Sequence, residues 1–259
     1  MAAQLELLAQ GDTLTLTLNN PGKRNAVDLA LWQRLAGVFA DIAGDKQLRC
    51  VVIRGAGEVF AAGGDLEEFL TVRATLEQAL TYHDDAVAAA LRGIRDCPVP
   101  TVAAIRGPCV GGGLEIAACC DLRLASDDAV FGAPINRLGF SMYPGEMAVL
   151  LERVPAAVLA EILLEGRLLN AAEALAKGLV TRVVPVAELE SEVEATVSRI
   201  RGGAPLVARW HKQWLRRLQS GEPLTAEEKA ESFAFLDTAD YREGMAAFLE
   251  KRRPVFKAE

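Results

Sequence analysis

Hydrophobic and polar residues alternate along the first part of the chain and then change to a helical spacing. The run Thr-Leu-Thr-Leu-Thr-Leu at residues 13–18 has the period of a half-buried strand, and Asn-Asn-Pro-Gly at residues 19–22 interrupts it. We therefore expect the chain to open as a β-hairpin or meander. From Asp28, a favourable N-cap, apolar residues recur at helical spacing up to Gly44, which stands where a C-cap glycine belongs. The apolar positions of this helix are Leu31, Leu35, Val38 and Ile42.

Short apolar runs followed by glycine predict buried strands in the middle of the chain. Residues 50–53 (Cys-Val-Val-Ile) and 101–105 (Thr-Val-Ala-Ala-Ile) are too short and too β-branched to favour helices. A glycine-rich turn at residues 107–113 leads from the second run into a helix start at residues 114–118, and another strand is expected at residues 122–125. This alternation predicts an α/β fold.

The last third of the chain is predicted to be almost entirely helical. Helices are expected at residues 147–153, 156–165 and 170–177, and the third precedes a strand at residues 179–184. Thr225 and Glu228 form a capping box, and a final helix carries Met245, Phe248 and Leu249 on one face with residues 251–253 (Lys-Arg-Arg) in its last turn. We place a boundary near residue 200, between a core at residues 1–200 and a helical region at residues 201–259.

Charge and composition favour a small-molecule enzyme. The 259 residues carry 28 Lys and Arg against 35 Asp and Glu, a net charge of −7, without a basic cluster on an aromatic stripe, which argues against nucleic-acid binding. The five cysteines and two histidines lack metal-site spacing, so we expect buried, reduced thiols and no metal. With neither a membrane-spanning run nor a basic, apolar leader, a cytoplasmic protein is expected.

Two glycine-rich segments and one glutamate are the candidate chemistry. The segments at residues 54–65 and 105–115 each follow a strand, but Phe60 takes the third-glycine position of a dinucleotide fingerprint, and neither segment contains a Walker sequence. Glu115 follows three glycines and stands between Leu114 and Ile116. The helix N-terminus stabilises its charge, whereas burial raises its pKa toward the range useful for acid–base catalysis. Taken alone, these residues leave a catalytic and a structural role equally open.

Several motifs in the same order resemble the enoyl-CoA hydratase/isomerase superfamily, the crotonases, over essentially the whole chain. The matching segments are Asn20-Pro21-Gly22-Lys23-Arg24-Asn25-Ala26, residues 60–66 (Phe-Ala-Ala-Gly-Gly-Asp-Leu), residues 107–115 with Asp121, residues 131–134 (Phe-Gly-Ala-Pro), residues 172–174 with 178–180, and residues 242–252.

The resemblance implies a crotonase-like spiral of ββα units with a helical C-terminal trimerisation region, giving a homotrimer or homohexamer. It places the backbone N–H groups of Gly64 and Gly112 in an oxyanion hole for a thioester oxygen, where small residues allow close approach. It implies an acyl-CoA substrate, with CoA as part of the thioester and no permanently bound cofactor. The charge pattern and the lack of a membrane-spanning run predict no nucleic-acid or membrane partner. By this resemblance CoA contacts Lys23, Arg24, Ala26, the segment Ala62, Gly64, Asp65 and Leu66, and, in a neighbouring subunit's site, Lys251.

The chain departs from the family pattern at one catalytic position. Typical hydratases carry a second glutamate where this chain has Ile135, and Asn136 beside it is not an acid. Tyr143 and Glu146 are the candidate replacements, whereas His83 is expected to be solvated. Asp65 is expected to support the site, cap a helix or react.

The leading hypothesis is hydration of a 2-enoyl-CoA with Glu115 as acid–base. The alternatives are isomerisation, decarboxylation or thioester hydrolysis by a divergent crotonase, and a CoA-binding scaffold without turnover.

Overall fold

The computed structural model of the chain describes residues 3–259 and begins with a β-hairpin. Strand β1 (Gln4–Gln10) pairs antiparallel with β2 (Thr13–Asn19), with Leu7 opposite Leu16. At the turn Gly11 takes a left-handed conformation with φ of 62°, which glycine adopts without a steric penalty. The hairpin expected from the alternating sequence is confirmed.

The strands form two sheets. The larger has six strands in the order β1-β2-β3-β4-β6-β9, all parallel except β1, and the smaller has three in the order β5-β7-β8. The remaining strands are β3 (Cys50–Gly55), β4 (Thr101–Ile105), β5 (Pro108–Val110), β6 (Leu122–Ser126), β7 (Val130–Gly132), β8 (Leu169–Asn170) and β9 (Arg182–Val184).

The chain winds as a spiral in which a strand of the large sheet, a strand of the small sheet and a helix follow one another. The clearest turn consists of β4, β5 and α5 (Gly112–Cys119). After β3, Ala61 forms a parallel bridge with Cys109 of β5 and so extends the small sheet by one residue. The α/β fold class and the crotonase-like spiral are therefore confirmed.

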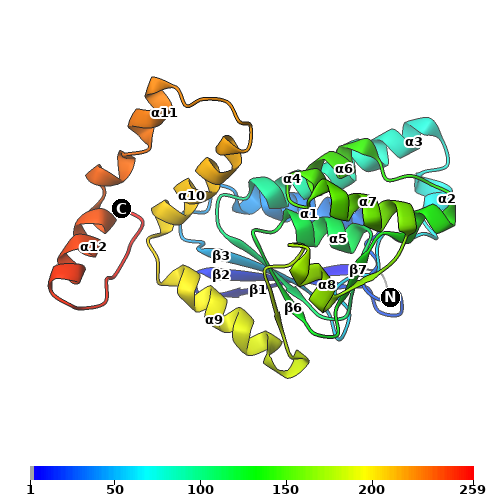
Figure 1. Ribbon diagram of the computed structural model, residues 1–259, viewed down its shortest axis with the longest axis horizontal. Helices are drawn as coiled ribbons and strands as arrows, with labels where there is room; N and C mark the ends of the chain where they lie inside the picture. Colours follow the sequence, from blue (N-terminus) through cyan, green and yellow to red (C-terminus); the bar gives the residue numbers. More distant parts are fainter. Residues whose placement is uncertain (1–2) are drawn as a thin grey trace.

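Helices cover both faces of the large sheet (Figure 1). On one face α1 (Leu29–Ile42), α4 (Ala88–Asp96) and α5 pack around fully buried side chains such as Trp32 and Leu91. Asp28 caps α1, because its Oδ1 accepts a hydrogen bond of 2.8 Å from the Leu31 N–H. The other helical segments that precede residue 189 are α2 (Phe69–Val72), α3 (Leu76–Leu80), the π-helical η1 (Thr81–Val87), the 3₁₀ segment η2 (Pro134–Leu138), α6 (Pro144–Leu151), α7 (Ala156–Glu165), α8 (Ala171–Ala176) and the 3₁₀ segment η3 (Val186–Glu188).

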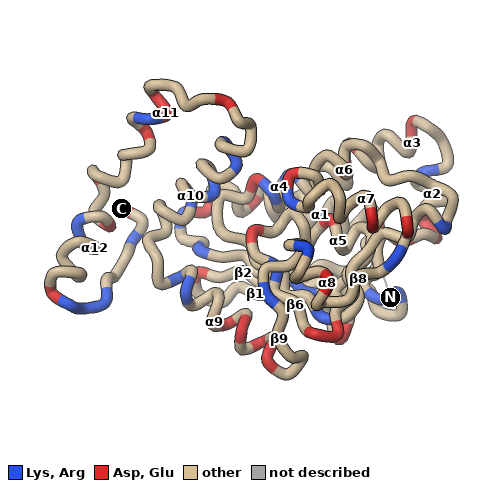
Figure 2. The backbone as a smooth tube through the Cα atoms, in the orientation of Figure 1, with Lys and Arg blue, Asp and Glu red and all other residues tan. Residues whose placement is uncertain are grey.

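Helix α9 (Leu189–Arg201) covers the opposite face of the sheet, where Leu189 and Val193 pack on β3, β4 and β6. Acidic residues lie in its first turn and basic residues in its last, a distribution that Figure 2 shows and that complements the helix dipole.

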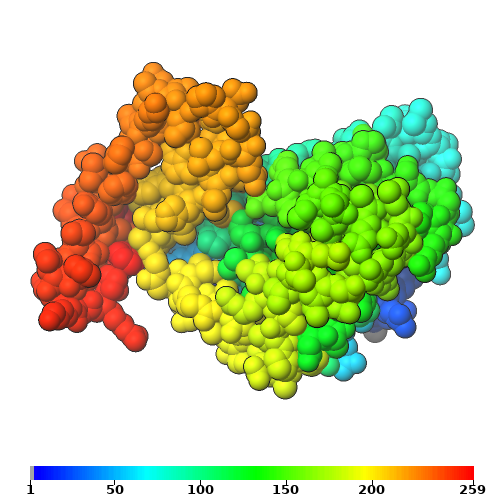
Figure 3. All heavy atoms as spheres, in the orientation of Figure 1, coloured from blue at the N-terminus to red at the C-terminus, as the bar shows by residue number. Residues whose placement is uncertain are grey.

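The final helices form an arm that stands away from the rest of the molecule (Figures 1 and 3). The arm consists of α10 (Pro205–Leu218), α11 (Ala226–Glu231), the 3₁₀ segment η4 (Ala234–Asp237) and α12 (Ala239–Leu249). A hollow of about 400 Å³ lies between α10 and α12. The capping box of Thr225 and Glu228 is confirmed at the start of α11.

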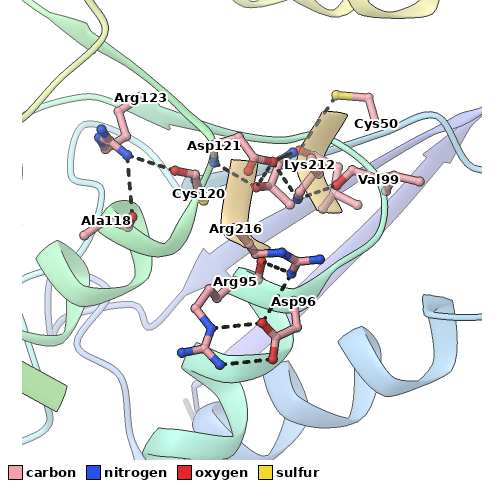
Figure 4. A network of polar contacts seen from close by, with 12 residues as sticks. Cys50, Arg95, Asp96, Val99, Ala118, Cys120, Asp121, Arg123, Lys212 and Arg216 are labelled. Carbon is pink, nitrogen blue, oxygen red and sulfur yellow. Dashed lines mark hydrogen bonds and ion pairs between the residues drawn. The ribbon is translucent and has the colours of Figure 1, made fainter. Parts of the chain in front are cut away.

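Polar contacts attach α10 to the body (Figure 4). The buried Lys212 ammonium lies 2.6 Å from an Asp121 carboxylate oxygen and donates to the Val99 carbonyl at 2.8 Å. One helical turn later, Arg216 donates to the Arg95 carbonyl at 2.7 Å. Because a buried ammonium must keep its partners, these contacts determine where the arm leaves the core.

Three local expectations are corrected. The last helix ends at Leu249, so Lys251 and its basic neighbours follow the helix instead of forming its last turn, and Lys251 itself has a left-handed φ of 54°. Helix α6 was expected from residue 147 but begins at Pro144, whose ring suits a first helical position. Strand β9 was expected over residues 179–184 but covers only Arg182–Val184.

Two other expectations concern cysteines and the membrane. All five cysteines are buried and free, as expected. None of the helices between residues 3 and 259 is both long and apolar enough to cross a membrane. The cellular location and the boundary near residue 200 stay predictions.

Candidate active site

The two glycine-rich turns meet at the bridge between Ala61 and Cys109. The Ala61 N–H donates to the Pro108 carbonyl at 3.0 Å, and the Val110 N–H donates back to the Ala61 carbonyl at 3.0 Å. The second turn packs directly on this bridge, since a Cβ on Gly113 would lie 2.6 Å from the Ala61 carbonyl oxygen. Both Gly63 and Gly111 have positive φ, of 110° and 51°. Glycine is therefore required for the shape of these turns as well as for their close approach.

The turns leave two backbone N–H groups without a protein acceptor. The neighbours of Gly64 are paired, because the Gly63 carbonyl accepts from Val27 and the Asp65 N–H donates to Val27. Gly112 is the first residue of α5, where a backbone N–H has no helical acceptor. Neither Gly64 nor Gly112 has its N–H paired with any other residue in the described chain, and both line the same cavity. The structure thus brings the two predicted oxyanion donors together.

The cavity has a volume of about 220 Å³ and walls of mainly apolar and aromatic residues. Trp32 closes it beneath Gly112, where a Cβ would lie 2.9 Å from the Trp32 ring, and the Trp32 indole donates to the Tyr82 hydroxyl at 3.2 Å. Other residues that line it include Phe69, Val87, Ile135, Leu138, Phe140 and Met142. An acyl chain is a suitable occupant for such walls.

Glu115 projects from the first turn of α5 into this cavity and is only 6% exposed. Burial raises the pKa of its carboxyl well above the ordinary value of 4.5, and the nearby negative charge of Glu146 raises it further. The cavity around Glu115 therefore favours the protonated form of its carboxyl group.

Glu146, from the first turn of α6, supplies a second carboxyl group to the same cavity. Its Oε1 lies 2.5 Å from the Nδ1 of His83, and the His83 Nε2 lies 3.3 Å from a terminal nitrogen of Arg73. A guanidinium can only donate, so Nε2 must accept and the imidazole proton resides on Nδ1, from which it is donated to Glu146. Within the described chain, the second Glu146 oxygen accepts no hydrogen bond from protein.

Tyr143 and Ile135 also lie at the cavity. The Tyr143 ring stacks on His83 with a centroid separation of 5.2 Å, and its hydroxyl donates to Asp84 at 2.7 Å. This hydrogen bond raises the pKa of the Tyr143 hydroxyl. Ile135 lines the cavity as an apolar wall, so the residue found at the usual place of the second glutamate cannot transfer a proton.

The two segments expected to contact CoA lie side by side. The Ala62 N–H donates to the Arg24 carbonyl at 3.0 Å, and Ala26 is buried behind this contact. Ala62 and Leu66 are exposed at the cavity mouth. Asp65 is buried and accepts from the Lys23 ammonium at 2.6 Å. Asp65 therefore holds the Lys23 ammonium of the loop in place.

Of the two lysines expected to contact CoA, Lys23 lies in the loop beside the cavity and Lys251 lies far from it. Lys23 also contacts Glu67 at 2.8 Å, and these carboxylates raise the pKa of its ammonium. Lys251 follows α12, which lies at the opposite end of the molecule from α2 and α3 (Figure 1). A single chain therefore does not bring Lys251 to this cavity, and its contact with CoA stays a prediction that requires a neighbouring subunit.

Comparison with known proteins shows the family of this chain. Residues 9–259 match the family described as enoyl-CoA hydratase/isomerase. The chain belongs to the enoyl-CoA hydratase/isomerase family. It is similar to the solved structure of an enoyl-CoA hydratase/carnithine racemase from Magnetospirillum magneticum, with 49% sequence identity and a TM-score of 0.95, covering 98% of this chain and 96% of the other.

Two curated members of the family are related over nearly their full length. A probable enoyl-CoA hydratase of Mycobacterium bovis is 35% identical over 244 residues, which are 93% of each chain. A carnitinyl-CoA dehydratase of Proteus mirabilis is 34% identical over an alignment of 266 positions that covers 99% of each chain. The family resemblance seen in the sequence motifs is confirmed.

The sequence did not predict the positions of two side chains at this cavity, those of His83 and Arg73. His83 was expected to be solvated, but its side chain is only 13% exposed and is bonded on both ring nitrogens, because η1 directs it toward α6. Arg73 was not singled out at all. The available signal was weak: one of only two histidines lies beside a tyrosine in a helical stretch, and π-helical turns often mark functional sites.

The raised pKa of Glu115 predicts a pH-dependent cost to stability. Below about pH 4.5 the carboxyl is protonated in both states, whereas above it only the unfolded chain loses the proton, so the free energy of unfolding falls as pH rises toward the folded-state pKa. We expect Glu115→Gln to match wild type at pH 4 and to be more stable at pH 8, as measured by urea unfolding.

The control for this measurement is Glu194→Gln, the same change on the exposed face of α9. It should behave like wild type at both pH values. A Glu115→Gln variant that is less stable than wild type at pH 8 would show that folding does not raise the pKa of the Glu115 carboxyl.

Proposed function

We propose that this protein hydrates 2-enoyl-CoA thioesters and catalyses the reverse dehydration. The observation that carries the proposal is the pair of carboxyl groups in one cavity, Glu115 as the acid and Glu146 as the base, beside the N–H groups of Gly64 and Gly112. Two carboxyl groups with different environments can take opposite roles in proton transfer. Glu146 thus supplies the second proton-transfer group, which Ile135 cannot supply.

The proposed reaction begins with the thioester oxygen between the two glycine N–H groups. The unpaired Glu146 oxygen takes a proton from water, and the water oxygen forms a bond to C3 of the acyl group. The electrons of the double bond move toward the thioester, and the N–H groups of Gly64 and Gly112 stabilise the enolate oxygen, each by about 3 to 4 kcal/mol in comparable sites. Glu115 then gives its proton to C2, and proton exchange between the two carboxyl groups and solvent restores the starting state.

His83 and Tyr143 are proposed as positioning residues. His83 holds one Glu146 oxygen, which leaves the other available for water, and Tyr143 supports the imidazole through the stacked ring. CoA is proposed to lie along the Lys23 loop and the exposed Ala62 and Leu66, with the thioester entering at the glycine turns. No permanently bound cofactor is required by this chemistry.

The decisive experiment follows the loss of absorbance of the conjugated thioester in crotonyl-CoA. Glu115→Gln and Glu146→Gln should each lower kcat by about 10²- to 10⁴-fold, because each removes one proton-transfer group, while Glu194→Gln retains wild-type activity. Competition by free CoA measures binding in every variant. Loss of activity in Glu115→Gln alone would contradict the role of Glu146. A wild-type protein that binds CoA without consuming crotonyl-CoA would refute hydration and favour the isomerase, decarboxylase, hydrolase or scaffold alternatives.

We further propose that the protein forms a homotrimer through its arm, with pairing of trimers into a homohexamer. Support comes from exposed apolar side chains along the arm, of which Phe248 and Leu249 on α12 are 77% and 74% exposed. Apolar surface of this extent favours association. In such an assembly the arm of one chain would bring Lys251 toward a neighbour's site.

The assembly is tested by light scattering after size-exclusion chromatography. Phe248→Asp should reduce the molar mass from that of a trimer or hexamer to that of the 27.7 kDa chain, because it buries a charge in the contact. Ala187→Asp, which adds the same charge on the exposed η3 segment outside the arm, should leave the assembly intact. A wild-type protein that elutes as a monomer would contradict the proposal.

A further inference from the structure

Arg73 places a cation in the wall of the acyl cavity. It follows α2, and its guanidinium carbon lies 3.8 Å from the centroid of the Phe69 ring and 4.5 Å from that of the Phe140 ring. The two rings pack edge to face with centroids 6.0 Å apart. Contacts of this kind attract the cation to the rings and hold the guanidinium in place.

Most of the hydrogen-bonding capacity of Arg73 is unused. One terminal nitrogen donates to the His83 Nε2, and no carboxylate in the described chain lies within ion-pair distance of the guanidinium. Arg95, which is also half-buried, instead contacts the carboxylates of Asp96 and Glu152. Burial lowers the pKa of Arg73, as expected for a cation that lacks a direct anionic partner.

Arg73 lies near the proposed place of the acyl group and away from the proposed path of the CoA phosphates. A single imidazole, that of His83, separates Arg73 from Glu146, the proposed base at C3. A substrate group at Arg73 therefore lies only a few bonds beyond C3. The CoA phosphates are separated from the thioester by the whole pantetheine chain, and the loop with Lys23 is on their proposed path.

We propose that this cavity selects acyl-CoA thioesters whose acyl chain ends in a carboxylate, and that Arg73 binds that carboxylate. This inference rests on the proposed function, since it assigns the acyl group to the cavity. Arginine suits the role because its planar fork gives two parallel hydrogen bonds to one carboxylate. The same cation disfavours an acyl group that carries a trimethylammonium cation, by repulsion between like charges.

The inference is tested by calorimetric titration with saturated acyl-CoA thioesters, which bind without requiring turnover. Glutaryl-CoA and adipyl-CoA carry the carboxylate at two chain lengths, and 5-methylhexanoyl-CoA and 6-methylheptanoyl-CoA replace that carboxylate with an isopropyl group of similar shape. Wild type should bind at least one carboxylated compound about tenfold or more tightly than its neutral counterpart. In Arg73→Met, whose side chain can still pack on Phe69 and Phe140, the preference should disappear while free CoA binds as in wild type.

Arg92→Met is the matched control, because it removes the same charge from the exposed face of α4 and should retain the preference. The proposal is overturned if wild type binds the neutral compounds as tightly at both lengths. It is also overturned if Arg73→Met weakens both members of a pair equally, or if it weakens free CoA, which would assign the cation to the CoA phosphates. Because these are binding measurements, a failure of crotonyl-CoA hydration does not affect their outcome.

Discussion

The pairing of Ala61 with β5 is the constraint on which the site depends. Two backbone hydrogen bonds of 3.0 Å join Ala61 to Pro108 and Val110, although these segments belong to successive turns of the spiral. The pairing brings both glycine turns to one point and directs one unpaired N–H from each toward the same cavity. It also determines where α5 begins, and therefore how deeply Glu115 is buried. In this fold the proposed oxyanion site is a consequence of backbone pairing. Glycine is required at residues 63 and 111 by their positive φ and at residue 113 by its contact with Ala61.

Electrostatics then assigns different roles to groups of the same kind. Glu115 sits among apolar neighbours, and burial raises the pKa of its carboxyl group, while Glu146 accepts a hydrogen bond from His83, which in turn accepts one from Arg73. The charge of Glu146 acts on Glu115 through the cavity and reinforces its protonation. The protein thus retains an arrangement that lowers its stability above the ordinary carboxyl pKa, as is common where a buried group serves catalysis. A change at Arg73 or His83 would act on Glu146 without touching the reacting carbon atoms.

Much of the framework was predictable from the sequence, because it depends on local patterns. Alternation gave the hairpin, β-branched runs gave β3 and β4, and the glycines before Glu115 gave the start of α5. The motifs also indicated the two glycine segments that meet at the cavity. The chain of contacts from Arg73 through His83 to Glu146 was not predictable in full, because its members come from three segments whose approach depends on the π-helical turn η1 and on the packing of α6. The end of α12 was misplaced because the basic residues after it also suit a helix terminus.

The central claim is that Gly64 and Gly112 hold the thioester oxygen beside Glu115. The most direct measurement is a crystal structure of the protein with butanoyl-CoA, a saturated thioester that cannot add water. The account predicts that the thioester oxygen lies about 3 Å from both glycine nitrogens, with C2 facing Glu115 and C3 facing Glu146. A thioester oxygen that contacts neither nitrogen, or an acyl group outside this cavity, would contradict it.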